Sequence, residues 1–188
     1  MLGASIEPGN SRGLLVARGA ILACQARMPA GLSLSGSIGF FMLIRDFQPS
    51  DLPILSEIDQ KCFPPGVSYS RKELAAFIAH RSARTWVAED EGAIVGFVVA
   101  SREPARVGHI ITIDVLEDSR RKGTGTVLMK AAEDWSRKAG LQLIYLETAE
   151  DNLAAHSLYE ARGYRKVDKV ERYYSNGQAA WVMMKHLK

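Results

Sequence analysis

The stretch Ser119-Arg120-Arg121-Lys122-Gly123-Thr124-Gly125-Thr126 decides how this chain is interpreted. It follows the apolar run 107–116, which is typical of a strand, and it opens the stretch 123–139, whose apolar residues recur at helical spacing. Backbone N–H groups at the start of a helix bind anions, and glycines let an oxyanion approach them closely. With three cations beside the glycines, the stretch predicts a phosphate or pyrophosphate site. The alternative is an ordinary basic turn before a helix.

Two familiar phosphate motifs do not fit this loop. A P-loop ends in Gly-Lys-Ser/Thr, but here Gly125 is followed by Thr126 and Val127. A dinucleotide fingerprint needs a third Gly or Ala where this chain has Leu128. The pattern therefore favours another phosphate-bearing ligand.

The regions on either side of the loop have regular strand and helix patterns. A capping box at Ser70 and Glu73 opens one helix, and Asp90-Glu91-Gly92 is typical of a hairpin turn. The patterns predict strands near 42–46, 85–89, 93–100, 107–116, 141–148, 164–170 and 179–185, and helices near 51–62, 70–78, 123–139 and 152–162. The order β-α-α-β-β-β-α-β-α-β-β predicts an α/β domain over 42–188, with a mixed sheet and helices on both faces.

The loop also matches the pattern Arg/Gln-x-x-Gly-x-Gly/Ala, through Arg120, Gly123 and Gly125. This pattern resembles the acetyl-CoA signature of the GCN5-related N-acetyltransferases (GNAT), and the likeness spans about four-fifths of the chain, from Met42 onward. Within that superfamily the second half resembles the RimI type, which acetylates the N-terminal alanine of a ribosomal protein. The stretches that carry this likeness are Tyr145–Thr148, Asn152–Ala155, Leu158–Glu160, Gly163-Tyr164 and Arg172–Tyr174.

The resemblance implies a twisted, mostly antiparallel sheet of about seven strands, with acetyl-CoA as cosubstrate and no metal. It implies that the backbone of Ile113 and Val115 binds the pantetheine arm and the acetyl carbonyl. In the family this strand carries a bulge and splays from the next one. The remaining cofactor-binding residues that the resemblance implies are Arg120, Arg121, Lys122, Gly123, Thr124, Gly125, Thr126, Asn152 and Tyr159.

Two residues are candidates for proton transfer. Glu147 lies on the same face of its predicted strand as Leu143 and Tyr145, so a carboxylate falls on an otherwise apolar face. The resemblance makes it the general base, acting directly or through water, while the alternative is a solvated strand end. Tyr159 is the candidate general acid, because a phenol can protonate a thiolate; the alternative is a core tyrosine.

The sequence signals for residues that bind the acceptor amine are less specific than those for the cofactor. Tyr173 and Tyr174 resemble the tyrosines that border the peptide site in the RimI type, but their spacing from Arg172 is shorter. The segment Cys62-Phe63-Pro64-Pro65 resembles the family's Phe-Pro-Trp without the tryptophan, which leaves the acceptor preference open.

The ordinary pKa values of amines favour an α-amine as acceptor. An α-amine with a pKa of about 7.7–8.0 is partly neutral at pH 7, whereas a lysine with a pKa of about 10.4 is almost fully protonated. The first hypothesis is therefore an N-terminal acetyltransferase, with a ribosomal protein among its possible partners. The second is an acetyltransferase for a small-molecule amine, and the third is a non-catalytic acyl-CoA-binding module.

Composition excludes several classes of protein. The chain has 188 residues, a net charge of +3 and two cysteines, which argues against a nucleic-acid partner, a disulfide scaffold and a membrane protein. The histidines and cysteines show no metal-ligand spacing. We therefore expect a cytoplasmic enzyme.

Residues 1–41 differ from the rest, since they carry three arginines and one acid. This segment is predicted to be an N-terminal extension in which apolar residues show little regular spacing. Three interpretations remain open: a transit peptide, a weak secretory signal, or an extension before a true start at Met42.

Overall fold

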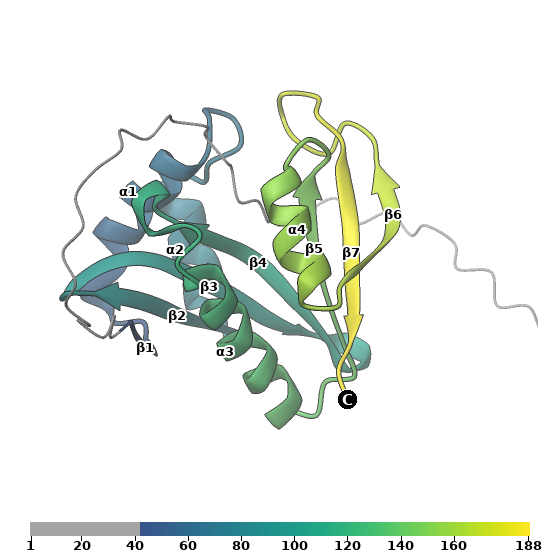
Figure 1. Cartoon of the computed structure of the whole chain (residues 1–188), viewed down its shortest axis with the longest axis horizontal. Helices are drawn as coiled ribbons and strands as arrows, with labels where there is room; N and C mark the ends of the chain where they lie inside the picture. Colours follow the sequence, from purple (N-terminus) through teal and green to yellow (C-terminus); the bar gives the residue numbers. More distant parts are fainter. Residues whose placement is uncertain (1–41) are drawn as a thin grey trace, which may run out of the picture.

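Seven strands form one sheet in the order β1-β2-β3-β4-β5-β7-β6 (Figure 1). The computed structural model describes residues 42–188, so the predictions made for 1–41 lie outside the described residues. The strands are β1 (Leu43–Asp46), β2 (Ala83–Asp90), β3 (Ala93–Glu103), β4 (Val107–Val115), β5 (Leu143–Ala149), β6 (Arg165–Val170) and β7 (Ala180–His186). Every neighbouring pair is antiparallel except β4 and β5. The predicted mixed, mostly antiparallel sheet is confirmed.

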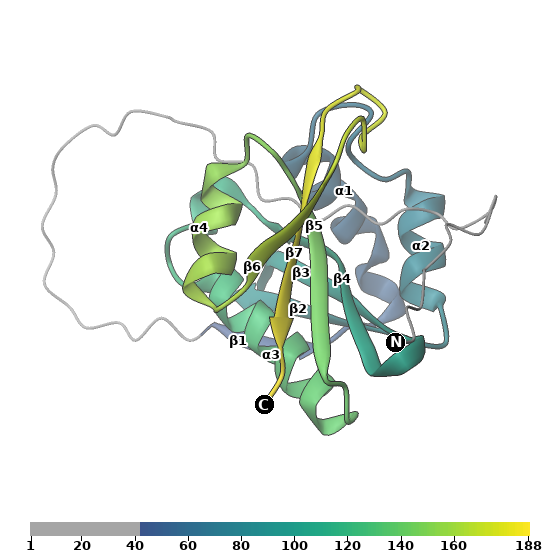
Figure 2. The same ribbon diagram turned by 90° about the vertical axis from the view of Figure 1, so that its right-hand side faces the viewer.

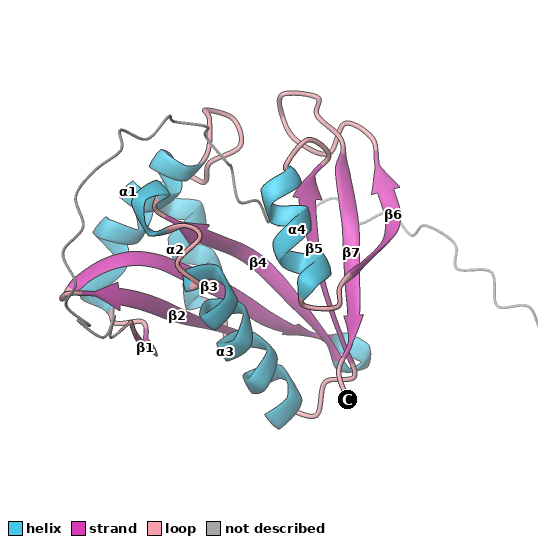
Figure 3. Ribbon diagram, in the orientation of Figure 1, coloured by secondary structure: helices cyan, strands magenta, loops and turns pink. Residues whose placement is uncertain are grey.

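The helices cover both faces of the sheet, as predicted (Figures 2 and 3). They are α1 (Leu52–Cys62), α2 (Arg71–Ala79), α3 (Thr124–Lys138) and α4 (Leu153–Ala161). Figure 2 shows α1 and α2 on one side of the sheet and α3 and α4 on the other. Within 42–188, the element order therefore agrees with the order read from the sequence patterns.

Each face of the sheet has its own apolar core. On the α3 and α4 side, Leu128, Ile144 and Tyr159 are fully buried together. On the α1 and α2 side, Leu55 and Phe97 belong to a second buried cluster. Because alternate residues of a strand point to opposite faces, β5 contributes to both cores.

Local sequence signals explain several boundaries. Ser70 accepts a hydrogen bond from the Glu73 backbone N–H, and the Glu73 carboxylate accepts one from the Ser70 backbone, which completes the predicted capping box of α2. Glu91 and Gly92 both have positive φ, of 51° and 82°, as the tight turn between β2 and β3 requires.

A buried carboxylate fixes α4 against the rest of the fold. Glu133 of α3 is 1% exposed and accepts hydrogen bonds from Arg162, just after α4, and from Lys185 of β7. Its distances to Arg162 Nη2 and Lys185 Nζ are 2.9 and 2.8 Å. Since α4 carries Tyr159 and is capped by Asn152, this network helps to hold both predicted site residues in place.

One strand is longer than the sequence indicates. The apolar pattern ends at Ala100, but β3 continues through Glu103, because Ser101, Arg102 and Glu103 pair with the start of β4. In the described part of the chain, no helix combines the length and apolarity needed to cross a membrane.

Candidate active site

The neighbouring strands β4 and β5 pair over only three residues of each strand. Val107–His109 lie opposite Leu143–Tyr145 in parallel register, and no further pair joins these two strands in the described chain. Both strands continue, to Val115 and Ala149, and diverge in Figure 1 toward the start of α4. The edge of β4 that faces β5 is thus open beyond His109, and its backbone groups have no partner on β5.

A bulge accompanies this divergence. Thr112 lies opposite Val99 and Ile110 opposite Ala100, so Ile111 is an extra residue in β4. Ile113 and Val115 follow the bulge with buried side chains, while their backbone belongs to the open strand. The Val115 carbonyl accepts a hydrogen bond from Arg120 Nε at 2.8 Å.

The predicted phosphate loop connects β4 to α3. Gly123 precedes the first residue of α3 and has a φ of 88°, a conformation that favours glycine. A Cβ at Gly123 would meet no atom within 4 Å, so space is open in front of the loop. The first N–H groups of a helix have no intrahelical acceptor, and the dipole makes this end positive. The geometry of an anion site is therefore present.

The cations of the loop are arranged differently from one another. Arg120 is directed inward, to the Val115 carbonyl and to the Cys62 sulfur at 3.7 Å, so its guanidinium ties the loop to the end of β4. Arg121 and Lys122 are exposed at the surface beside Gly123. Thr124 is buried, and its hydroxyl donates to the Ser119 carbonyl at 2.7 Å. Gly125 and Thr126 complete the first turn of α3.

The N-cap of α4 and one residue within it carry buried polar atoms. Asn152 caps the helix, because its Oδ1 accepts from the Ala155 N–H at 3.1 Å, while its buried Nδ2 has no hydrogen-bond partner among residues 42–188. Tyr159 is fully buried, and its hydroxyl also lacks a partner in the described chain. Burial raises the pKa of Tyr159, and the electrostatic effects of Tyr174 and Asp114 add to the increase.

Unpaired buried donors need a ligand or water, since an unsatisfied buried polar group costs about 1–3 kcal/mol. The open edge of β4, the Asn152 amide, the Tyr159 hydroxyl and the positive end of α3 are consistent with a long ligand that carries a phosphate at one end. The residues therefore fit acetyl-CoA.

Glu147 is buried on β5 rather than placed at a wet strand end. Its side chain is 12% exposed, and its Oε2 lies 2.9 Å from His109 Nε2 of β4. Tyr145 stacks on the same imidazole, with a centroid distance of 4.3 Å and an interplanar angle of 3°. These contacts arise because His109 and Tyr145 share a register position, and Glu147 lies two residues further along the same face.

His109 also contacts the end of β3. Its Nδ1 lies 3.3 Å from Glu103 Oε1, so the imidazole is held between two carboxylates. Burial alone would lower the pKa of His109, but hydrogen bonds to Glu103 and Glu147 outweigh it and raise the pKa to about 9. At neutral pH His109 is therefore an imidazolium.

The predicted acceptor tyrosines lie before β7, in the loop that follows β6. Their rings contact each other edge to face, with a centroid distance of 4.9 Å. Tyr174 is buried with the α1 and α2 core. Burial raises the pKa of Tyr173, and the negative charge of Glu147 adds to the increase.

The loop after α1 meets the loop between β6 and β7. Ser175 Oγ donates a hydrogen bond to the Gly66 carbonyl, across 109 positions of sequence. Figures 1 and 2 both show these two loops side by side at the same end of the molecule. The face that carries Glu147 is thus bordered by both loops.

The acid and base candidates lie on opposite faces of the sheet. Tyr159 belongs to the core on the α3 and α4 side. Glu147 lies on the other face of β5, which Ala149 shares with the α1 and α2 core. The gap between β4 and β5 therefore separates a proton donor on one side from a proton acceptor on the other.

Sequence reasoning missed His109 and Glu103. The histidines gave no cluster in sequence, because the contact between His109 and Glu147 depends on the parallel register of two strands that are far apart in the chain. His156 of α4 is also buried rather than solvent-facing: it is 4% exposed, and its Nε2 lies 3.0 Å from the Ala149 carbonyl oxygen.

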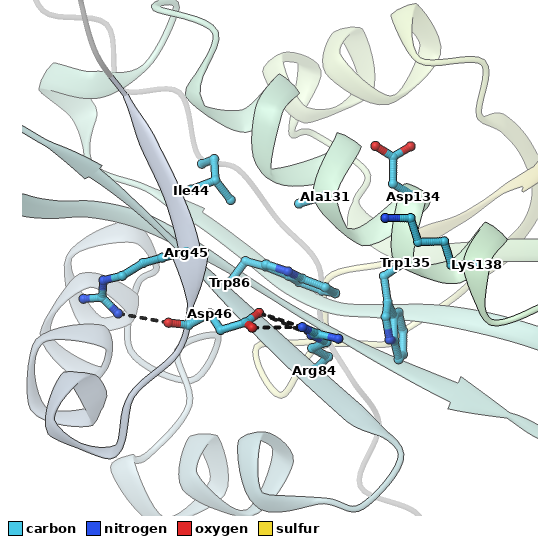
Figure 4. Close-up of a pocket in the computed structure, with 9 residues that line it drawn as sticks. All are labelled: Ile44, Arg45, Asp46, Arg84, Trp86, Ala131, Asp134, Trp135 and Lys138. Atoms are coloured by element: carbon cyan, nitrogen blue, oxygen red, sulfur yellow. Dashed lines mark hydrogen bonds and ion pairs between the residues drawn. The ribbon is translucent and has the colours of Figure 1, made fainter.

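A separate groove of about 490 Å³ lies between β1, β2 and α3 (Figure 4). Trp86 and Trp135 form its apolar part, with charged side chains of both signs around them, including Arg84, Asp46 and Lys138. None of the predicted site residues lines this groove. It is therefore distinct from the site between β4 and β5.

Comparison with known proteins gives consistent relatives. The model of the acetyltransferase (GNAT) family matches residues 52–164. An N-acetyltransferase from Methanocaldococcus jannaschii is 32% identical over 145 residues, covering 77% of this chain and 91% of the relative. The N-terminal acetyltransferase A complex catalytic subunit NAA10 from Arabidopsis thaliana is 33% identical over 156 residues, covering 77% and 78%.

Solved structures agree with this fold. Ard1 from Thermoplasma volcanium superposes with a TM-score of 0.72 and 27% identity, covering 78% of this chain and 98% of that one. The ribosomal-protein-S18-alanine N-acetyltransferase from Escherichia coli has the same fold, with a TM-score of 0.70, 23% identity and coverage of 79% and 95%. The family model matches more than half of this chain. The chain therefore belongs to the acetyltransferase (GNAT) family and is an acetyl-CoA-dependent N-acetyltransferase.

Proposed function

We propose that this protein transfers acetyl from acetyl-CoA directly to the N-terminal α-amine of a protein or peptide, in a ternary complex. The observation that carries the proposal is the buried Glu147 carboxylate beside the parted strands. Relatives named N-alpha-acetyltransferases, such as that of Sulfurisphaera tokodaii at 29% identity over 155 residues, support this class of acceptor.

Acetyl-CoA would bind along the open edge of β4 and at the N-terminal ends of α3 and α4. The pyrophosphate would bind the N–H groups from Gly123 to Thr126, with the cations Arg121 and Lys122 beside them. The pantetheine arm would bind the backbone around Ile113 and Val115 and the spare amide of Asn152.

The transfer needs a base on the acceptor side and an acid on the thiol side. Glu147 takes a proton from the α-ammonium, and the resulting amine attacks the thioester carbonyl. The nitrogen of the tetrahedral intermediate then loses its second proton to water, the C–S bond breaks, and Tyr159 gives its hydroxyl proton to the leaving thiolate. Tyr159 regains a proton from water before the next turnover. Backbone N–H groups on the open edge of β4 would stabilise the oxyanion.

The acceptor preference rests on chemistry and on the two contacting loops. An α-ammonium has a pKa near 8, so a single carboxylate suffices to deprotonate it, whereas a lysine ammonium at about 10.4 needs stronger help. The hydrogen bond between Ser175 and Gly66 joins the two loops that would border the acceptor. Tyr173 and Tyr174 would border that acceptor.

A panel of acceptors tests the proposal. The purified protein is incubated with acetyl-CoA and peptides with free N-termini, including a ribosomal-protein N-terminus that begins with alanine. N-terminally blocked lysine peptides and polyamines serve as competing amines. We expect α-amine acetylation by mass spectrometry. Acetylation of a small amine with no acetylated N-terminus would refute the proposed acceptor, and binding without any transfer would indicate a non-catalytic module.

Removing the exposed charges of the phosphate loop tests how the donor binds. We expect Arg121→Gln combined with Lys122→Gln to raise KM for acetyl-CoA about 3- to 10-fold with kcat nearly unchanged, because exposed charges each contribute about 0.3–1 kcal/mol near a helix start. The matched control is Lys138→Gln, at the opposite end of α3. An unchanged KM in the double variant would show that the pyrophosphate does not bind there.

A further inference from the structure

Glu103, at the end of β3, has no part in the transfer steps above, yet its carboxylate contacts Tyr145 and His109, which both lie beside Glu147. Tyr145 Oη lies 3.0 and 3.1 Å from its two carboxylate oxygens and donates to them. Its Oε1 lies 3.3 Å from His109 Nδ1. The side chain is 33% exposed, so this carboxylate lies between the buried site and solvent.

Three neighbouring strands bring this cluster to one face of the sheet. His109 lies opposite Ser101 on β3 and opposite Tyr145 on β5. Glu103 and Glu147 each lie two residues further along their strands, so both point to the face that carries the imidazole. The ring is thus fixed by a carboxylate at each nitrogen and by the stacked phenol of Tyr145.

We propose that Glu103 is a positioning residue for acetyl transfer, because it holds His109 as an imidazolium whose Nε2–H is directed at Glu147. This inference rests on the proposed role of Glu147 as the base. A carboxylate only accepts hydrogen bonds, so Glu103 requires a proton on Nδ1, and Glu147 requires one on Nε2. The pKa of His109, raised to about 9, agrees with this protonation state.

The proposal specifies where each proton is during transfer. His109 keeps both of its protons, and its Nε2–H stays on Glu147 Oε2. The first proton of the α-ammonium goes to the other oxygen of Glu147 and leaves to water after the product departs, and the second leaves the tetrahedral intermediate to water. Two carboxylates and one imidazolium carry a net charge of −1, which attracts an α-ammonium before it loses its proton.

The pH dependence of kcat separates this role from simple structural support. The groups that face His109 are Glu103 from β3 and Glu147 and Tyr145 from β5. In the wild type, we expect kcat at saturating peptide to fall above about pH 9, as His109 loses its proton. Glu103→Gln removes one of the charges that raise this pKa, so the fall should move to lower pH by about one unit or more.

Two further variants sharpen the test. Tyr145→Phe retains the stacked ring but frees the Glu103 carboxylate, so we expect a smaller shift in the same direction. Glu57→Gln removes an exposed carboxylate from α1 and should leave the profile unchanged. Thermal unfolding and KM for acetyl-CoA are measured for each variant, because a structural defect would alter these rather than the pH profile.

The titration of His109 by NMR, in the protein without substrates, completes the test. We expect its pKa to fall in Glu103→Gln, with the Nδ1 and Nε2 signals of an imidazolium at neutral pH in the wild type. An unchanged His109 titration and an unchanged alkaline limb in Glu103→Gln would overturn the inference. Because the titration needs no acceptor, it is independent of whether N-terminal peptides prove to be the substrates.

Discussion

Glu147→Gln is expected to lower kcat for peptide acetylation about 10²- to 10³-fold, which lies within the range of about 10²- to 10⁴-fold that a general base contributes. Glutamine fills nearly the same volume and can still accept from His109 Nε2–H, which lies 2.9 Å from the carboxylate. It cannot take a proton from the acceptor. Because Glu147 lies on the face opposite Tyr159 and α3, we expect the dissociation constant of acetyl-CoA, measured by calorimetry, to change little.

The matched control is Glu150→Gln, an exposed carboxylate just after β5 that pairs with Lys169 at 2.9 Å. Its activity should stay near that of the wild type. A Glu147→Gln protein that keeps more than about half of the wild-type kcat would remove Glu147 from the role of base.

The remaining activity of Glu147→Gln should depend on pH only through the ionisation of the acceptor amine. An uncatalysed attack depends only on the fraction of neutral α-amine, so its rate should rise with pH up to about 8, the pKa of the acceptor. This follow-up distinguishes loss of a base from loss of acceptor binding, which would raise KM for the peptide at every pH.

Much of the fold was predictable because its signals are local. The capping box at Ser70 and Glu73 and the turn at Glu91 and Gly92 each involve residues that are close in sequence. The order and faces of the elements follow from such signals together with apolar periodicity. The N-cap at Asn152 was likewise predictable, because asparagine is a preferred N-cap residue and stands directly before an apolar helix.

The site was only half predictable, because its remaining contacts depend on strand register. Strand parity placed Glu147 on a particular face, but nothing in the sequence shows that His109 lies opposite Tyr145. Glu103 was missed because its strand continues beyond the last apolar residue, sustained by pairing with β4. A polar residue in a long apolar strand, as His109 is, was the one signal that could have drawn attention to this cluster.

Tyr159→Phe is expected to lower kcat about 10²-fold without destabilising the protein, and this combination makes the test specific. The hydroxyl is fully buried and has no partner among the described residues, so folding removes it from water without a compensating hydrogen bond. Phenylalanine retains the packing and avoids that cost, which is about 1–3 kcal/mol. We therefore expect the melting temperature of the unliganded protein to stay the same or rise.

Tyr164→Phe is the matched control for this substitution. Tyr164 is also buried, its hydroxyl also lacks a hydrogen-bond partner in the described chain, and its ring lies 5.9 Å from that of Tyr159. It belongs to the same core but has no role in the proposed transfer. The two variants should therefore behave alike in thermal unfolding and differ in kcat.

The chemistry of the leaving group offers a second comparison. If Tyr159 protonates the thiolate, a donor thioester whose thiol has a lower pKa should need that proton less, and the loss in Tyr159→Phe should shrink. Equal losses with donors of high and low thiol pKa would indicate that Tyr159 orients the thioester instead. Wild-type kcat in Tyr159→Phe with acetyl-CoA would exclude both roles, because a buried hydroxyl that contacts the reacting atoms cannot be removed without an effect on the barrier.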